Sequence, residues 1–431
     1  MKTIRPTENP ERVLLVGLGL KKAPRVPGVT PGEAEQESLV ELEELARSAG
    51  AQVAGAVFQV REAPDPATVL GRGKLEEVKI EARLHQAPLI VFDGALTPGQ
   101  QRNIERATEC RVIDRTQLIL DIFARHARSR EGQLQVELAQ LNYLLPRLTG
   151  RGTELSRLGG GIGTRGPGEQ KLETDRRRIR ERIHKIQKSI ETVRRQRALR
   201  REARQSVPLG TVALVGYTNA GKSTLFNALS GSEVVVSSKM FATLDPTVRA
   251  VRMPSNRRVL LSDTVGFIRD LPPGLIAAFR ATLEEVQEAA LILQVTDVSN
   301  PQHVEQDAEV EEVLVELGVA GRPRLHVFNK VDRLSPEQVS LLSGNGKVLV
   351  SALTGAGLED LLRRIDEALP VDPLLRLNCS VPLADGKTLA LVHGLGRVLH
   401  SEVNDSQMSL EVELPESVAR RLKLLPVRAA V

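Results

Sequence analysis

One stretch of fourteen residues limits the possible folds of this chain more than any other: TVALVGYTNAGKST, residues 211–224. Its apolar start predicts a buried strand, which leads directly into the pattern Gly-x-x-x-x-Gly-Lys-Ser and then into a helical pattern. The glycines let backbone N–H groups wrap a phosphate chain, and the helix N-terminus adds the positive end of its dipole. The stretch therefore predicts a phosphate-binding loop in an α/β sheet, and a Gly-rich turn without a ligand is the disfavoured alternative.

Two side chains of this loop have expected chemical tasks. Lys222 should reach the β- and γ-phosphates as a catalytic cation, and the Ser223 hydroxyl should ligate Mg²⁺. The other loop residues should contact the nucleotide largely through their backbones. The expected binding set is Gly216, Tyr217, Thr218, Asn219, Ala220, Gly221, Lys222, Ser223 and Thr224.

The sequence Asn329-Lys330-Val331-Asp332 follows a predicted strand at 324–328 and decides which base is bound. The Asp332 carboxylate can accept hydrogen bonds from N1–H and the 2-amino group of guanine. Adenine lacks both donors and would leave this carboxylate unpaired. Asn329 and Lys330 should hold the loop and cover the base. GTP and GDP are therefore the expected ligands, and the backbone of Ser351, Ala352 and Leu353 should contact the guanine O6.

Asp263-Thr264-Val265-Gly266 lies between these two motifs, and this position indicates a role in binding Mg²⁺ and the γ-phosphate. Asp263 should hold Mg²⁺ through water, and the Gly266 N–H should contact the γ-phosphate as the second catalytic group. Small regulatory GTPases carry a Gln after this glycine to orient the attacking water. Here Phe267 stands there and cannot hydrogen-bond water, so we expect slow hydrolysis until a bound partner orders the site.

The first switch should lie between the phosphate loop and this motif, in the sequence FATLDPT. Thr243 is the expected second Mg²⁺ ligand, and Thr247 is the competing candidate. The expected nucleotide contacts in this segment are Phe241, Ala242, Thr243, Leu244 and Asp245.

Residues 1–130 alternate apolar runs with helical patterns, which predicts a small parallel or mixed α/β domain. The expected strands are RVLLVGL, QVAGAVFQV, PLIVFDG and CRVID, and the expected helices span 33–49, 74–85, 98–108 and 116–127. The sequence GRGK at 71–74 allows two interpretations, a phosphate nest or the turn that starts a helix.

Residues 131–206 carry two apolar seams of helical period, which predict an antiparallel helical hairpin. The first includes Leu134, Leu138, Leu141 and Leu145 and should end at Pro146; the second includes Ile179, Ile183, Ile186, Ile190 and Val193. The Gly- and Arg-rich connection at 148–169 is long enough to indicate a functional loop rather than a linker.

The charge of the chain is concentrated in this hairpin. Residues 147–204 contain 18 Lys/Arg and 7 Asp/Glu, a net charge of +11, so the remainder carries −6 within a total of +5. A basic module in an otherwise acidic protein predicts a polyanionic partner such as nucleic acid. Aromatic residues make up only 2% of the chain, which disfavours recognition by base stacking.

Repeated strand–loop–helix patterns predict a doubly wound GTPase domain at 207–371. A small α+β domain should follow at 372–431, with strands at 376–382, 397–403 and 408–414 and helices at 383–393 and 415–424. The two cysteines have no disulfide or metal-ligand spacing, and neither a signal peptide nor a membrane span is indicated. We therefore expect a cytoplasmic protein with no membrane insertion.

Residues 10–370, which include the nucleotide-binding motifs described above (the G motifs), resemble the HflX family of ribosome-associated GTPases. The strings that carry the resemblance are GYTNAGKSTLFNAL, FATLDPT, DTVGFIRDLP, AAFRATLEE, NKVD, GRGKLEE, QVELAQLNYLLPRLTG and GGGIGTRGPGEQKLETDRR. The last three are the most specific, since the G motifs fit many translation-factor-class GTPases.

The resemblance implies binding to the large ribosomal subunit and GTP-dependent splitting of stalled or idle ribosomes, notably under stress. It also implies that the loop at 148–169 reaches ribosomal RNA near the peptidyl-transferase centre, while the G domain occupies the GTPase-activating region. The alternative is a ribosome-assembly or RNA-folding factor that uses GTP as a timer. Because the hairpin pairs its apolar seams internally, we expect a monomer.

Overall fold

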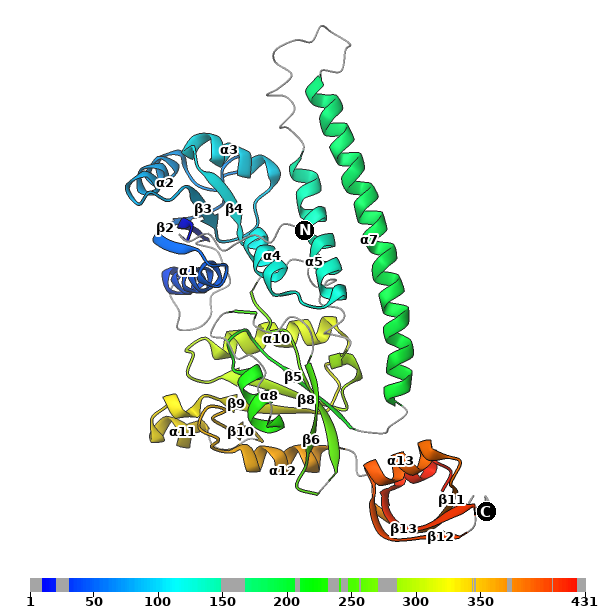
Figure 1. Cartoon of the computed structure of the whole chain (residues 1–431). Helices are drawn as coiled ribbons and strands as arrows, with labels where there is room; N and C mark the ends of the chain where they lie inside the picture. The colour runs from blue at the N-terminus through cyan, green and yellow to red at the C-terminus, as the bar shows by residue number, and fades with distance from the viewer. Residues whose placement is uncertain are drawn as a thin grey trace.

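The computed structural model describes twelve segments of the chain: residues 10–20, 31–148, 167–205, 210–231, 240–241, 247–255, 257–269, 285–342, 344, 346–369, 374–404 and 406–424. Three sheets and a long helical hairpin make up the described parts (Figure 1). In these segments, none of the helices combines the length and apolar character that a membrane crossing requires.

The N-terminal sheet has four parallel strands in the order β2-β1-β3-β4, with helices on both faces. The strands are β1 (Arg12–Leu20), β2 (Gln52–Arg61), β3 (Leu89–Phe92) and β4 (Arg111–Asp114). Helices α1 (Pro31–Ser48) and α4 (Arg115–His126) pack on one face, while α2 (Arg72–Leu84) and α3 (Pro98–Thr108) pack on the other. Gly71 is the N-cap of α2, so the GRGK sequence starts a helix.

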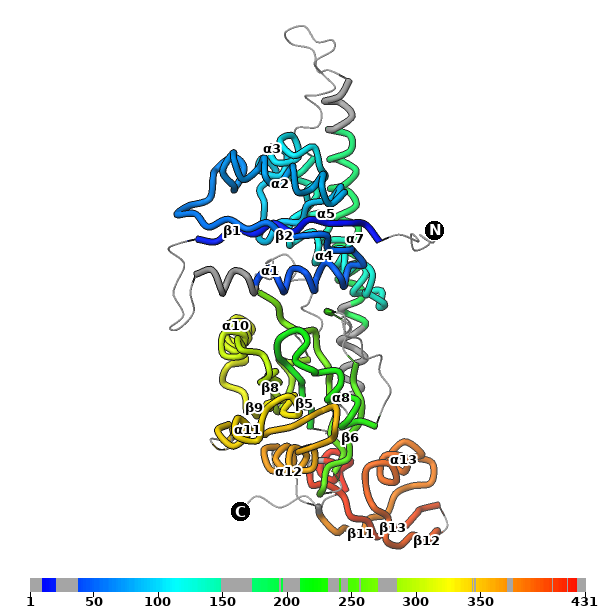
Figure 2. The backbone as a smooth tube through the Cα atoms, turned by 90° about the vertical axis from the view of Figure 1, so that its left-hand side faces the viewer, coloured from blue at the N-terminus to red at the C-terminus, as the bar shows by residue number. Residues whose placement is uncertain are grey.

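The predicted hairpin consists of α5 (Arg130–Arg147) and the 39-residue helix α7 (Pro167–Gln205), which lie side by side (Figures 1 and 2). A two-pronged ion pair joins Arg182 to Glu137 across them, with Nε–Oε1 at 2.7 Å. The second seam is buried at Ile186 and Ile190. Of the connecting loop at 148–169, residues 149–166 lie outside the described part of the chain.

The prediction that Pro146 ends the first hairpin helix is wrong by one residue, because α5 continues through Arg147. Arg147 is held by tertiary contacts. Its guanidinium lies 3.4 Å from the centre of the Tyr143 ring and donates to Leu96 O at 2.6 Å and to Asp114 Oδ2 at 3.1 Å. These contacts stabilise a last turn that already lacks the proline N–H donor.

The central sheet has six strands in the order β10-β9-β8-β5-β7-β6, and only β6 runs antiparallel to its neighbour. This is the doubly wound α/β arrangement that the sequence predicts. Its strands are β5 (Thr211–Val215), β6 (Thr247–Arg252), β7 (Arg258–Asp263), β8 (Leu291–Asp297), β9 (Arg324–Asn329) and β10 (Val348–Leu349). Its helices are α8 (Lys222–Ser230), α10 (His303–Glu316), α11 (Pro336–Leu342) and α12 (Leu358–Ala368), with the short 3₁₀ turn η1 (Val331–Arg333).

The chain ends in a three-stranded antiparallel sheet of order β11-β13-β12. Its elements are β11 (Leu374–Pro382), α13 (Gly386–Leu395), β12 (Arg397–Asn404), β13 (Gln407–Pro415) and α14 (Glu416–Arg421). The helices and the inner face of the sheet enclose a small core that includes Val392, Val412 and Leu414. All three strands and both helices occur within three residues of the bounds that the sequence predicts.

One apolar cluster continues from the α1/α4 face of the N-terminal sheet to the central sheet. Phe123 on α4 and Phe241 meet edge to face, with ring centres 4.6 Å apart and an interplanar angle of 82°. Edge-to-face contacts of this kind add to the gain from burying the rings. The two sheets are therefore joined by a shared core next to the G motifs.

Candidate nucleotide-binding site

The phosphate-binding loop leaves β5 at Gly216 and enters α8 at Lys222. Two of its positions require glycine. Gly216 has φ +150°, and a Cβ there would collide with the carbonyl oxygen of Val295 on β8. Gly221 has φ +91°, and a Cβ there would collide with Nδ2 of Asn329. Any other residue at either position would push the loop away from the neighbouring strand ends.

Lys222 is buried, with 6% of its surface exposed. Its ammonium group donates to Gly216 O at 3.0 Å and to Tyr217 O at 2.7 Å, so it lies inside the curve of the loop. Burial lowers the pKa of Lys222 to about 8, an effect that the positive Lys330 reinforces and the negative Asp263 opposes. A phosphate entering the loop would meet a cation that has already lost its water.

Ser223 and Asp263 form a pair of hard oxygen donors at the first turn of α8. The Ser223 hydroxyl donates to Asp263 Oδ2 at 2.7 Å, and Asp263 is fully buried at the end of β7. A hydroxyl and a carboxylate suit Mg²⁺, which prefers oxygen ligands and keeps several waters. Within the described segments there is no group of three or more His, Cys, Asp or Glu that could hold a metal without a nucleotide.

The residues after Asp263 pair with the phosphate loop. Phe267 N–H donates to Gly216 O at 3.1 Å, and Thr218 N–H donates to Phe267 O at 2.7 Å. Gly266 lies so close to the loop that a Cβ would stand 2.8 Å from the Thr218 Cα and 2.9 Å from the Lys222 Nζ. Only glycine fits there. The backbone of this motif therefore lies beside the cation that should bind phosphate.

Contacts within the protein organise the predicted guanine motif. Asn329 donates from Nδ2 to Ala220 O at 2.9 Å and accepts the Ala352 N–H at 3.0 Å, so it links the phosphate loop to the segment after β10. The Ser351 hydroxyl donates to Asp332 Oδ1 at 2.6 Å. The sheet thus brings together three of the segments to which the sequence assigns GTP and GDP binding.

The remaining predicted residues fall into two groups. Asn219, Thr224, Thr264, Val265, Val331 and Leu353 are described and lie in the segments expected for them, with Leu353 80% exposed. Phe241 is 4% exposed, whereas Ala242, Thr243, Leu244 and Asp245 lie outside the described residues. Thr247, the competing Mg²⁺ ligand, begins β6.

Sequence reasoning missed the contribution of helix α1 to this region. The Tyr217 hydroxyl donates to Glu41 Oε1 at 2.6 Å and accepts the Arg269 N–H at 2.8 Å. The Ser48 hydroxyl accepts the N–H of Met240 at 2.9 Å. Burial and the Glu41 carboxylate both raise the pKa of Tyr217, so its hydroxyl remains a donor. No local motif marks these residues of α1.

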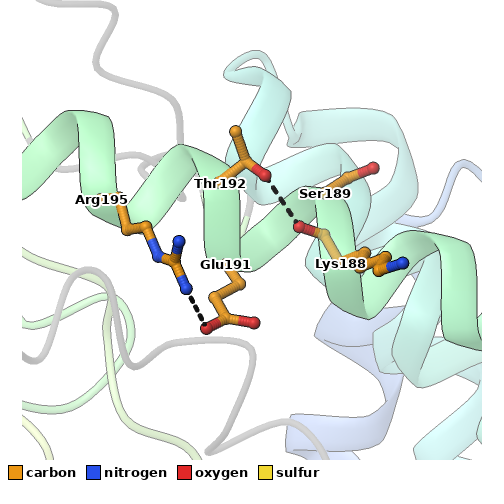
Figure 3. Close-up of a pocket in the computed structure, with 5 residues that line it drawn as sticks. All are labelled: Lys188, Ser189, Glu191, Thr192 and Arg195. Carbon is orange, nitrogen blue, oxygen red and sulfur yellow. Dashed lines mark hydrogen bonds and ion pairs between the residues drawn. The ribbon is translucent and has the colours of Figure 1, made fainter.

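A separate pocket of about 350 Å³ lies on α7 and belongs to the hairpin (Figure 3). Within it, Arg195 pairs with Glu191 at 3.0 Å, and the Thr192 hydroxyl donates to Lys188 O at 3.0 Å. The five lining residues are Lys188, Ser189, Glu191, Thr192 and Arg195. They come from a single helix and include none of the predicted nucleotide-binding residues.

Comparison with known protein families covers most of the chain. Residues 36–124 match the model of the GTP-binding GTPase N-terminal region, and residues 126–204 match that of the GTP-binding GTPase middle region. Residues 211–330 match the model described as 50S ribosome-binding GTPase.

Individual relatives agree with these matches. GTPase HflX of Caldanaerobacter subterraneus subsp. tengcongensis is 46% identical over 390 residues, covering 90% of each chain. GTPase HflX of Escherichia coli is 42% identical over 393 residues, covering 90% of this chain and 92% of the relative. A GTP-binding protein of the archaeon Sulfolobus solfataricus, solved with GDP, is 25% identical with a TM-score of 0.43 over 83% of this chain and 98% of that one. The 46% and 42% identities to the two HflX proteins, over nine-tenths of the sequence, show that the chain belongs to the HflX family of P-loop GTPases, which hydrolyse GTP.

Proposed function

We propose that this GTPase binds the large ribosomal subunit in its GTP form, splits stalled or idle ribosomes, and is released after hydrolysis to GDP. The observation that carries the proposal is the attachment of a long basic hairpin to a GTP-binding sheet. Only five residues separate the end of α7 from the start of β5. Nucleotide chemistry in the central sheet can therefore act on a partner bound along the hairpin.

The surface of α7 suits a phosphate backbone. Arg177 and Arg178 are each 75% exposed, and Arg195 is 79% exposed. Their ion pairs within the helix are between exposed groups, which stabilise little and leave the guanidinium groups available. Arginine is suited to two-pronged recognition of phosphate, and such contacts carry no sequence information. The surface therefore fits a nucleic-acid backbone, and ribosomal RNA is the partner that we propose.

We assign the chemistry to residues of the G motifs. Lys222 would neutralise the β- and γ-phosphates, the Gly266 N–H would bind the γ-phosphate, and Asp332 would select guanine. Ser223 would hold Mg²⁺ directly, with Asp263 acting through water and Thr243 as the second protein ligand. When bound, Mg²⁺ would supply positive charge to the phosphate oxygens.

Phe267 is the reason to propose a partner-dependent rate. Its ring is 5% exposed and packs in an apolar cluster, and its side chain has no atom that could orient water. Turnover of GTP by the free protein should therefore be slow and should rise by orders of magnitude when large subunits are added. Rapid turnover without ribosomes would refute this part of the proposal.

Four parts of the chain would share the work. Residues 1–130 would lie over the G motifs, 131–206 would bind RNA through the loop at 148–169 near the peptidyl-transferase centre, and 207–371 would bind GTP in the GTPase-activating region. Residues 372–431 would form a small accessory domain. We propose that the protein acts as a monomer in the cytoplasm.

Sedimentation tests the proposal directly. Purified protein is mixed with separated subunits or intact ribosomes in the presence of GTP, GDP or a non-hydrolysable GTP analogue. We expect co-sedimentation with the large subunit in the GTP and analogue samples, and conversion of intact ribosomes into subunits. Binding to the large subunit without any loss of intact ribosomes would instead favour the ribosome-assembly alternative.

A further inference from the structure

Asp297 lies outside the G motifs of the sequence, yet its carboxylate contacts one of them. It is the last residue of β8, and the parallel register places it beside Asn329, the last residue of β9. Lys330 follows directly, and its Nζ lies 2.6 Å from Asp297 Oδ2. Two adjacent strand ends thus bring together side chains that are 33 residues apart in sequence.

The carboxylate of this pair is fixed at both oxygens. Asp297 Oδ1 accepts the Ser299 N–H at 3.0 Å and the Ser299 hydroxyl at 2.6 Å, while Oδ2 faces Lys330. The side chains of Asp297 and Lys330 are only 14% and 16% exposed. A carboxylate held in this way has one orientation, so the lysine ammonium is held at one point.

The alkyl stem of Lys330 runs past the phosphate loop. Its Cε lies 3.9 Å from the position that a Cβ of Gly221 would occupy, and its backbone has φ +65°. The positive charge of Lys330 also lowers the pKa of Lys222, so the two ammonium groups act on one another. Asp297 places a compensating negative charge directly beside the ammonium group of Lys330.

We propose that Asp297 is a positioning residue for nucleotide binding, which anchors the Lys330 ammonium so that the alkyl stem is already ordered against one face of the base. This rests on the assignment of Lys330 and Asp332 to guanine recognition made above. The stem contact is apolar and does not depend on the exchangeable groups of the ring. Asp297 therefore strengthens the binding of any purine that the site admits, whereas Asp332 selects guanine.

The first test compares the full-length Asp297→Ala variant with the wild type, using GTP, GDP and ITP as probes in equilibrium binding. Ordering a flexible side chain only on binding costs affinity, so we expect Kd to rise roughly three- to tenfold for all three ligands. The ratio of GTP to ITP affinity should stay the same, and kcat at saturating GTP with ribosomes should be unchanged. Unchanged Kd values, or a loss confined to kcat, would overturn the inference.

A double-mutant cycle separates positioning from a general structural effect. In a Lys330→Ala background, Asp297→Ala should have no further effect on Kd, because the side chain that it orders is gone. An equal further loss in that background would show that Asp297 acts in some other way. Asp297→Asn keeps the shape of the side chain and an acceptor for Ser299, so its Kd should lie between those of the wild type and Asp297→Ala. If the alanine variant does not fold, the asparagine variant provides the test.

Two controls complete the design. The Glu44 carboxylate acts on Lys330 through charge without a direct contact, so Glu44→Gln should leave every Kd within about twofold of the wild type. A larger effect of Glu44→Gln would mean that net charge, not anchoring, controls affinity. Asp332→Asn should reduce the preference for GTP over ITP; if it does not, the guanine site itself is wrongly assigned, which is a different failure from that of Asp297.

Discussion

The hydroxyl group of Tyr217 donates a hydrogen bond to Glu41 and thereby joins the second residue of the phosphate loop to helix α1, 176 residues earlier in the chain. The same oxygen accepts the backbone N–H of Arg269, just after the motif that should contact the γ-phosphate. Glu41 also pairs with Arg115, which is 2% exposed and bonded to Asp93 as well. One buried network therefore joins the N-terminal sheet to both segments that are predicted to contact phosphate.

Tyr217→Phe should loosen this junction, because it removes the hydroxyl and keeps the ring. Glu41 loses one of its partners and the Arg269 N–H loses its acceptor, at a cost of about 1–3 kcal/mol. We expect hydrogen exchange of the Arg269 amide to become faster by a corresponding factor. Tyr143→Phe is the matched control, since its hydroxyl, on α5, donates to Asp114 at the end of β4. Equal exchange at Arg269 in both variants would contradict the prediction.

Gly221→Ala should disrupt nucleotide binding through Asn329. The new Cβ would collide with the amide that donates to Ala220 O, and the backbone at φ +91° adds strain of about 1–3 kcal/mol. We expect the Kd for GTP to rise at least about tenfold. Gly231→Ala is the control, because it has φ +61° with no atom within 4 Å of the added Cβ. It should lower stability but leave Kd within about twofold, and a similar loss of affinity in both variants would contradict the assignment.

The pKa of Lys222, lowered to about 8 mainly by burial, predicts a pH dependence of GTP binding. Below pH 8 the cation is charged before the phosphate arrives, whereas above it the phosphate must also draw in a proton. We expect constant affinity up to about pH 7.5 and a loss approaching tenfold per pH unit above pH 8. Calorimetry in buffers of different ionisation enthalpy should detect proton uptake at pH 8.5.

The same pKa has a consequence for stability with a defined sign. In the unfolded chain the lysine titrates near its ordinary value of about 10.4, so between about pH 8 and pH 10 the unfolded state holds more protons. The contribution of Lys222 to stability therefore rises with pH across this window.

A Lys222→Arg variant is the control for the proton uptake that should accompany GTP binding. Arginine keeps its charge throughout, so the variant should show no proton uptake at pH 8.5. Uptake that persists in this variant would exclude Lys222 as its source.

Charge reversal on α7 tests the RNA surface. Arg177→Glu combined with Arg178→Glu should weaken binding to large subunits. The slope of the logarithm of the binding constant against the logarithm of the salt concentration should decrease in magnitude by about two. GTP hydrolysis by the free protein should be unchanged. Arg363→Glu with Arg420→Glu changes the net charge equally at exposed sites elsewhere. If this control pair lowers the salt slope as much, the hairpin is not the binding surface.

Local sequence determines much of this structure, because apolar periodicity places strands and helices and the glycine pattern shapes the phosphate loop. The link between Asn329 and Ala220, 109 residues apart, could also be expected, since both belong to one recognised set of motifs. By contrast, an amphipathic pattern shows which face of α1 is buried but does not show that Glu41 meets Tyr217. Such contacts arise when the N-terminal sheet packs against the central sheet, and no local sequence pattern encodes this packing.

Asp297 illustrates the same limit at shorter range. It is one of 54 acidic residues, and only the register of β8 and β9 brings it to Lys330. Pro146 shows a different error. The local rule that proline ends a helix predicts the end of α5 one residue too early, because Arg147 is held by tertiary contacts.

Helix α7 has a mechanical consequence for a molecule built in this way. A continuous helix of 39 residues is about 58 Å long at 1.5 Å per residue, and five residues separate its end from β5 of the central sheet. Pivoting such a rod by only about 5° at its base would sweep its far end through about 5 Å. If the protein splits ribosomes as we propose, a small rearrangement beside the triphosphate would be magnified along such a rod.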